Sequence, residues 1–260
     1  MRSCRIWLGL ALVAAGIASA IAQGPTLGGN TAGQQSSPLV AAAQLLNEAQ
    51  TSFARVNDYT GMFYKQERVN GQLNPEQTIQ IRVRQQPFSV YLKWNGPQKF
   101  VGQEACFVSG KNSNMVRVKA ATGLASAIGW VSIDPKGPRA TANDRHSITD
   151  FGIGHLIERM TRNVDEYRKQ PPDQTQITFG EYRFLQKACV RMETTHRTNT
   201  GQFYAARTVI YFDKETRLPV RAEAYDWPKA GGTQGGDLLE CYSYVDMKFN
   251  VGLTDAAFNY

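Results

Sequence analysis

The stretch QTIQIRVRQQPFSVYLKWNG, residues 77–96, decides the fold class of this chain of 260 residues. Apolar and polar side chains alternate from Ile79 to Val83 and again from Phe88 to Trp94. A period of two residues is typical of a β-strand with one buried face. The short connection between the two alternations predicts antiparallel neighbours, because parallel strands need a long crossover.

Strand-like segments continue on both sides of this stretch. Further strands are expected at 99–109, 114–120, 126–133, 175–184, 187–197, 203–213, 217–226 and 238–249. About eleven strands in one open sheet would curve strongly. We therefore predict an α+β fold: a strongly curved antiparallel sheet of about eleven strands, forming an open half-barrel with an apolar trough.

Two amphipathic helices are available to cover this sheet. Pro38 opens the first, which is predicted from Leu39 to Asn57 with apolar residues at helical spacing. The second is predicted from Thr149 to Lys169, where either Ser147 or Thr149 is suited to cap the first turn. We expect this middle helix to act as a lid or plug over the trough.

The N-terminus reads as an export signal. Residues 1–22 begin with Arg2 and Arg5, continue as an apolar run and end in small residues, so cleavage is expected after Ala22. Residues 23–37 predict a disordered leader, and residues 38–260 a single domain. The mature protein is expected to be soluble and exported. Cys4 precedes the apolar run, where lipid attachment would not use it.

Three segments resemble a known family: YTGMFYKQERVNG (59–71), QQPFSVYLKWNGPQKFVGQEACFVSGKN (85–112) and YVDMKFNVGLTDAAFNY (244–260). They are similar to the LolA-like fold of periplasmic lipoprotein carriers. In that fold, one strand carries a Pro-Phe pair followed by a Trp. The last strand ends in an Asn, which is followed by a short turn and a Phe. The residues in those places here are Pro87, Phe88, Trp94, Asn250 and Phe258.

Over most of residues 40–260 the chain is identified as a member of an exported bacterial family of unknown function that resembles the LolA-like fold. The segment DRHSITDFGIGHLIERM, residues 144–160, contributes to this identification. The resemblance implies a periplasmic, non-catalytic carrier or binding protein for a lipid or lipoprotein.

Aromatic and apolar side chains of the strands and the middle helix are the candidate cavity lining. Side chains fill the interior of a small closed barrel tightly. Two short helices fill the trough of a wide curved sheet less tightly, which favours a cavity. The candidate ligand-binding residues are Trp94, Phe100, Phe107, Trp130, Phe151, Ile153, Leu156 and Met160.

A polar cluster, Asp144, Arg145 and His146, precedes the middle helix. With Ser147 it suggests a hydrolase, but adjacent residues in one extended segment rarely place a base across from a nucleophile, and no G-x-S-x-G elbow is present. The other interpretation is that Arg145 and His146 pin the loop by hydrogen bonds. We predict no catalytic residue and no cofactor.

Metal binding and disulfide formation have little support in the sequence. His155 and Glu158 share a helix face, but two ligands do not make a metal site. Cys106, Cys189 and Cys241 remain after signal cleavage, either as three buried thiols or as one disulfide and a thiol.

The net charge and the predicted export of the protein together indicate its expected partners. The formal net charge of +7 includes Arg2 and Arg5, and the rest is spread along the chain. This diffuse charge fits either transient contact with an anionic membrane or simple solubility. An exported protein is not expected to bind nucleic acid. The expected partner is a lipid or acylated ligand, and the alternative function is an envelope sensor or interaction domain that binds a protein.

Overall fold

The computed structural model describes residues 37–229 and 235–259. The predicted export signal, and the predicted leader up to residue 36, lie outside these residues. The helices are α1 (Pro38–Phe53), α2 (Leu124–Ile128), α3 (Pro138–Thr141) and α4 (Ile153–Tyr167), with short 3-10 turns η1 (Gln98–Phe100), η2 (Asn112–Asn114), η3 (Ile148–Asp150) and η4 (Asp255–Phe258).

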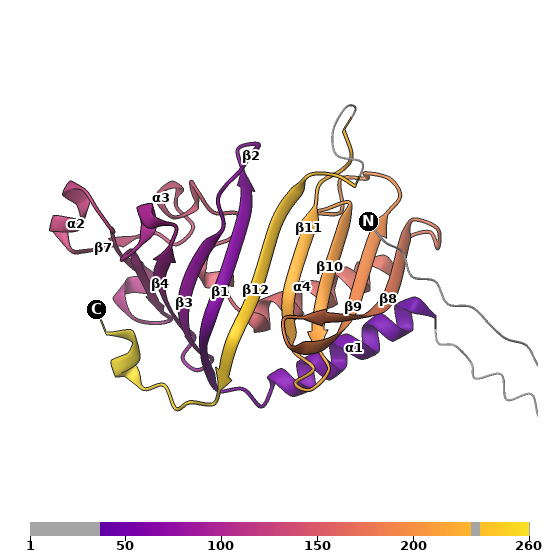
Figure 1. Ribbon diagram of the computed structural model, residues 1–260, viewed down its shortest axis with the longest axis horizontal. Helices are drawn as coiled ribbons and strands as arrows, with labels where there is room; N and C mark the ends of the chain where they lie inside the picture. Colours follow the sequence, from indigo (N-terminus) through magenta and orange to yellow (C-terminus); the bar gives the residue numbers. More distant parts are fainter. Residues whose placement is uncertain (1–36, 230–234, 260) are drawn as a thin grey trace, which may run out of the picture. The chain divides into compact units, whose positions relative to one another are not determined.

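One antiparallel sheet contains all the strands of the described residues, in the order β7-β6-β5-β4-β3-β1-β12-β11-β10-β9-β8, with β2 paired to β1 (Figure 1). The strands are β1 (Asp58–Val69), β2 (Gln72–Leu73), β3 (Gln77–Arg84), β4 (Ser89–Gly96), β5 (Glu104–Val108), β6 (Val116–Lys119), β7 (Trp130–Ile133), β8 (Thr175–Phe184), β9 (Lys187–His196), β10 (Arg207–Asp213), β11 (Pro219–Tyr225) and β12 (Leu238–Phe249). The sheet is open, because β7 and β8 are not paired to each other. The predicted α+β fold with an open antiparallel sheet is confirmed.

The first helix ends earlier than the predicted Asn57. Ser37 caps its start, with the hydroxyl accepting the Val40 N–H at 3.3 Å. Helix α1 stops at Phe53, and beyond it the N–H of Asn57 donates to the side chain of Asn250 at 2.7 Å. This contact turns the chain from helix into strand β1.

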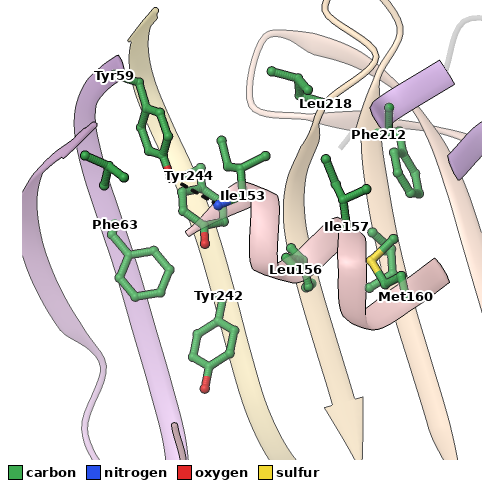
Figure 2. Close-up of a cluster of buried hydrophobic side chains, with 14 of the residues drawn as sticks. Tyr59, Phe63, Ile153, Leu156, Ile157, Met160, Phe212, Leu218, Tyr242 and Tyr244 are labelled. Atoms are coloured by element: carbon green, nitrogen blue, oxygen red, sulfur yellow. Dashed lines mark hydrogen bonds between the residues drawn. The ribbon is translucent and has the colours of Figure 1, made fainter. Parts of the chain in front are cut away.

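The middle helix begins at Ile153, four residues after the predicted Thr149. Ser147 caps the separate 3-10 turn η3. Gly152, with φ of 107°, is not helical and separates η3 from α4. The first N–H of α4, on Ile153, donates to the hydroxyl of Tyr59 on β1 at 3.1 Å (Figure 2). A cap from the sheet therefore replaces the predicted local cap.

The main core lies between α1, α4 and one face of the sheet, called here the inner face. Ile153, Leu156, Ile157 and Met160 of α4 point toward side chains of the strands (Figure 2). Alternate residues of β1, β3 and β4 supply the sheet side of this core. The alternation that predicted the strands therefore also selects the face that the helices cover.

The outer face is not uniformly exposed. Tyr91, Cys106 and Val108 are buried there against Phe258 of η4. The carboxylate of Asp58 holds the C-terminal segment by accepting the backbone N–H groups of residues 251, 252 and 253. The end of the chain thus supplies a cover for the outer face.

Candidate functional site

A cavity of about 180 Å³ lies between the inner face of the sheet and the segment that runs from α3 to α4. Leu92, Ala105 and Val118 form one row across β4, β5 and β6 on its sheet side. Phe151 and Leu156 line it from the segment leading into α4 and from α4 itself. This half of the cavity is apolar.

The structure brings together some of the predicted ligand-binding residues. Trp94, Phe151 and Leu156 line the cavity. Ile153 and Met160 are buried in the adjoining core, on the same side of α4 as Leu156 (Figure 2).

The other three predicted residues lie elsewhere. Phe107 is buried in the core beside Phe88, with ring centroids 6.3 Å apart, and Phe100 is partly buried at η1. Trp130 packs on the outer face, against the cluster that contains Phe258. None of these three lines the cavity among the described residues.

Charged residues line the other half of the cavity. Lys65 and Glu67 follow Phe63 on the inner face of β1, and the Lys65 ammonium binds Asp144 and lies 3.4 Å from Glu67. Burial lowers the pKa of Lys65, but the charges of Asp144 and Glu67 outweigh burial and raise the pKa above its ordinary value. Lys65 is therefore charged and ties the α3–α4 segment to the sheet.

Glu240 on β12 lies directly opposite Glu67 on β1. Its carboxylate contacts Nε2 of His146 at 2.7 Å, accepts the hydroxyl of Tyr204 at 2.6 Å and lies 3.7 Å from Arg159. Burial raises the pKa of Glu240, but the hydrogen bond and charge of His146, together with Arg159 and Tyr204, lower it to about 2. Two hydrogen-bond donors, His146 and Tyr204, and the charge of Arg159 thus keep a buried carboxylate ionised.

Tyr242 joins the two carboxylates. Its hydroxyl bonds to Glu67 and lies 3.2 Å from Glu240. Burial, followed by the negative charges of Glu240 and Glu67, raises the pKa of Tyr242 well above its ordinary value. The phenol therefore stays protonated and acts as a donor. We call Lys65, Glu67, Asp144, Arg145, His146, Arg159, Glu240 and Tyr242 the ionic cluster.

The predicted polar residues hold their loop in place. The backbone N–H of Arg145 donates to Glu67 at 3.1 Å, and its guanidinium donates to the carbonyl of Arg68 at 2.7 Å. With the His146–Glu240 bond, these contacts link Arg145 and His146 to β1 and β12. The Ser147 hydroxyl donates to the carbonyl of Pro135 at 2.8 Å, so its proton is directed away from His146. The geometry of a serine–histidine pair is not formed.

The other histidines stand apart from the cavity. His155 and Glu158 contact each other at 3.3 Å on α4, as their spacing predicts. His196 stacks on Phe203 with ring centroids 3.8 Å apart, and burial lowers its pKa to about 4. In residues 37–229 and 235–259, no three His, Cys, Asp or Glu side chains gather as metal ligands would. Cys106, Cys189 and Cys241 are free and buried.

Sequence reasoning missed five members of the ionic cluster: Lys65, Glu67, Arg159, Glu240 and Tyr242. A signal was present in β1, where Lys65 and Glu67 occupy the same alternation as the buried Tyr59 and Phe63. A charge at an inward position needs a partner, because an unpaired buried ion is costly. The identity of that partner depends on the β1–β12 pairing, which no local pattern reveals.

Comparison with known proteins identifies a family. The model of the family described as "Protein of unknown function (DUF1571)" matches residues 56–260. No curated protein matches the chain. Across the part of the chain that the structure describes, no helix has the length and apolar character needed to cross a membrane.

Several solved structures are similar to this chain. The lipoprotein LppX of Mycobacterium tuberculosis is 10% identical, with 83% of this chain and 98% of that chain covered and a TM-score of 0.47. A putative outer membrane lipoprotein-sorting protein domain from Vibrio parahaemolyticus is 13% identical, with 84% and 97% covered and a TM-score of 0.38. A LolA superfamily protein from Nitrosomonas europaea is 10% identical, with 84% and 97% covered and a TM-score of 0.35.

Proposed function

The chain belongs to the DUF1571 family, and we propose that it is an exported, non-catalytic binding protein or carrier for a lipid or acylated ligand. The observation that carries this proposal is the division of the cavity into an apolar half and a charged half. The proposed export rests on residues 1–22, which read as an export signal. A periplasmic location follows from the proposed carrier role.

The cavity suits an amphiphile better than a purely polar or purely apolar molecule. Its apolar half, around Leu92 and Ala105, would shield methylene groups, each worth about 0.8 kcal/mol when buried. Its charged half offers both signs: Lys65 and Arg159 against Glu67 and Asp144. A ligand with a chain and a polar end matches both halves at once.

The volume of the cavity limits what this closed conformation holds. Its 180 Å³ is only slightly larger than the cavity of about 150 Å³ that binds benzene in a small engineered protein. A short part of an acyl chain fits. A longer chain requires either displacement of α4 or a continuation of the cavity.

Mass spectrometry of lipid extracted from the purified full-length protein tests the proposal. A defined lipid in stoichiometric amount, absent from a buffer control, is the expected result. Ala105→Phe should abolish this lipid, because the new ring fills the apolar half of the cavity. The matched control is Ala188→Phe, an exposed residue of β9, which should retain the lipid.

Two results would count against a carrier. If the wild-type protein carries no lipid and takes up no fluorescent fatty acid, the cavity has no acyl ligand. If an envelope protein binds equally to wild type and Ala105→Phe, the sensor or interaction function is the better account. Melting temperatures of both variants verify that they are folded.

A further inference from the structure

A second hollow of about 280 Å³ opens at the surface beside the start of α4. Aromatic rings line it from four places in the chain: Phe53 at the end of α1, Tyr59 on β1, Phe88 before β4, and Phe151 before α4. Its polar residues are Gln85, His155 and Glu158. We call this hollow the aromatic cleft.

Phe151 belongs to both hollows. It lines the aromatic cleft and also the cavity of about 180 Å³ described above, called here the main cavity. Its ring packs edge-on against Phe63, which also lines the main cavity, with ring centroids 5.0 Å apart. Gly152, next in the chain, lines only the main cavity, whereas Gly154 lines only the cleft. The segment from Phe151 to Gly154 is therefore the wall between them.

The backbone of this wall is fixed, but the Phe151 side chain is less confined. The Ile153 N–H donates to Tyr59, and Ile153 is almost fully buried. A Cβ at Gly152 would lie 2.5 Å from the Tyr59 hydroxyl, so the backbone sits close against β1. Phe151, by contrast, is only half-buried. Of the two side chains in the wall, Phe151 is therefore the less buried.

The three regions follow one another along β1. Tyr59 lines the cleft, Phe63 the apolar half of the cavity, and Lys65 and Glu67 its charged half. At roughly 3.3 Å per residue, this path from Tyr59 to Glu67 is about 26 Å long. Along β1 the path is charged at Lys65 and Glu67 and aromatic at Phe63 and Tyr59, and the Phe151 ring interrupts it.

We propose that the aromatic cleft is a second compartment of the ligand site, which takes the end of a single linear acyl chain whose other part lies in the main cavity. This inference rests on the proposed function and narrows its ligand class to amphiphiles with one long unbranched chain. Continuity through Phe151 and the aromatic lining of the cleft identify the occupant.

Fatty acids of two chain lengths test the proposal, measured by displacement of a fluorescent fatty acid from the full chain. Wild type should bind hexadecanoate more tightly than decanoate, by about fourfold for each methylene that enters the cleft. Gln85→Trp fills the cleft from the end of β3 and should weaken hexadecanoate binding by at least about tenfold, with decanoate within about twofold of wild type. His155→Trp fills it from α4 and should do the same.

Gln80→Trp is the matched control, because Gln80 is exposed on β3 and lines neither hollow. It should bind both acids as wild type does. If both cleft variants keep wild-type affinity for hexadecanoate, or lose decanoate equally, the second compartment is refuted while the proposed function stands. If wild type binds neither acid, the proposed function itself fails. Melting temperatures identify any variant that does not fold, and the other cleft variant then decides.

Discussion

Replacing Glu240 by Gln should make the stability of the protein less dependent on pH. The Glu240 side chain is 6% exposed, and His146, Tyr204 and Arg159 surround it. These donors hold its pKa at about 2 in the folded protein, below the ordinary 4.5. A carboxyl whose pKa is lower in the folded state stabilises the fold at pH values above its unfolded pKa.

The magnitude follows from this difference in pKa. Each unit corresponds to about 1.36 kcal/mol, so ionised Glu240 contributes about 3 kcal/mol at neutral pH. The contribution is complete above about pH 5 and is lost as the pH falls toward 2. At about pH 3 less than half of it remains. Gln cannot ionise, so the variant lacks this dependence.

Urea unfolding of wild type and Glu240→Gln at about pH 7 and pH 3 measures the effect. The difference in unfolding free energy between the two proteins should narrow by about 2 kcal/mol on acidification. The control is Glu166→Gln, which removes an exposed ion pair with Lys169 and should change stability by less than about 1 kcal/mol at both pH values. A difference for Glu240→Gln that is the same at both pH values would refute the reasoning.

Three further substitutions test close contacts and buried charges of the fold, each measured by urea unfolding. Gly154→Ala should cost about 1–3 kcal/mol, because its Cβ would lie 2.5 Å from a ring carbon at the end of α1; Gly180→Ala, which has open space, should cost nothing, and equal effects would contradict this explanation. Asp58→Ala removes the acceptor of three backbone N–H groups and should cost about 2–3 kcal/mol, against less than about 1 kcal/mol for the exposed Asp173→Ala. Lys65→Met leaves the buried Glu67 and the partly exposed Asp144 without their cation and should cost about 3–5 kcal/mol; a loss below about 1 kcal/mol would show that these ion pairs are dispensable.

The fold could be predicted from the sequence because each strand has a local residue pattern that identifies it. The alternations in β3 and β4 specify a buried face, and short connections specify antiparallel pairing. In a short strand, the alternation does not show which side chains point to the inner face. β7 has only four residues, and Trp130 points to the outer face, away from the cavity. The predicted start of the middle helix was wrong because a distant residue, Tyr59, caps α4.

The ionic cluster marks the limit of prediction from the sequence. His146 was identified as a loop residue with a polar partner, but its partner Glu240 lies 94 residues further along the chain. Glu67 and Glu240 meet only because β1 and β12 pair at the centre of the sheet. Two like charges placed opposite each other are unfavourable unless other groups neutralise them. The neutralising groups come from the loop and α4, which are brought there by the tertiary fold.

On the proposed function, the position of the ionic cluster suits it to orient the ligand as well as to stabilise the fold. A buried ionic cluster is often no more stable than apolar residues of the same volume, so stability alone does not explain it. On both central strands the inward side chains change from aromatic to charged toward the same end: Phe63 is paired with Tyr244, Lys65 with Tyr242, and Glu67 with Glu240. An apolar chain gains nothing by entering the charged end, because it would displace hydrogen bonds there. On the proposed function, the ligand therefore lies with its polar end at the cluster and its chain toward Phe151 and the aromatic cleft.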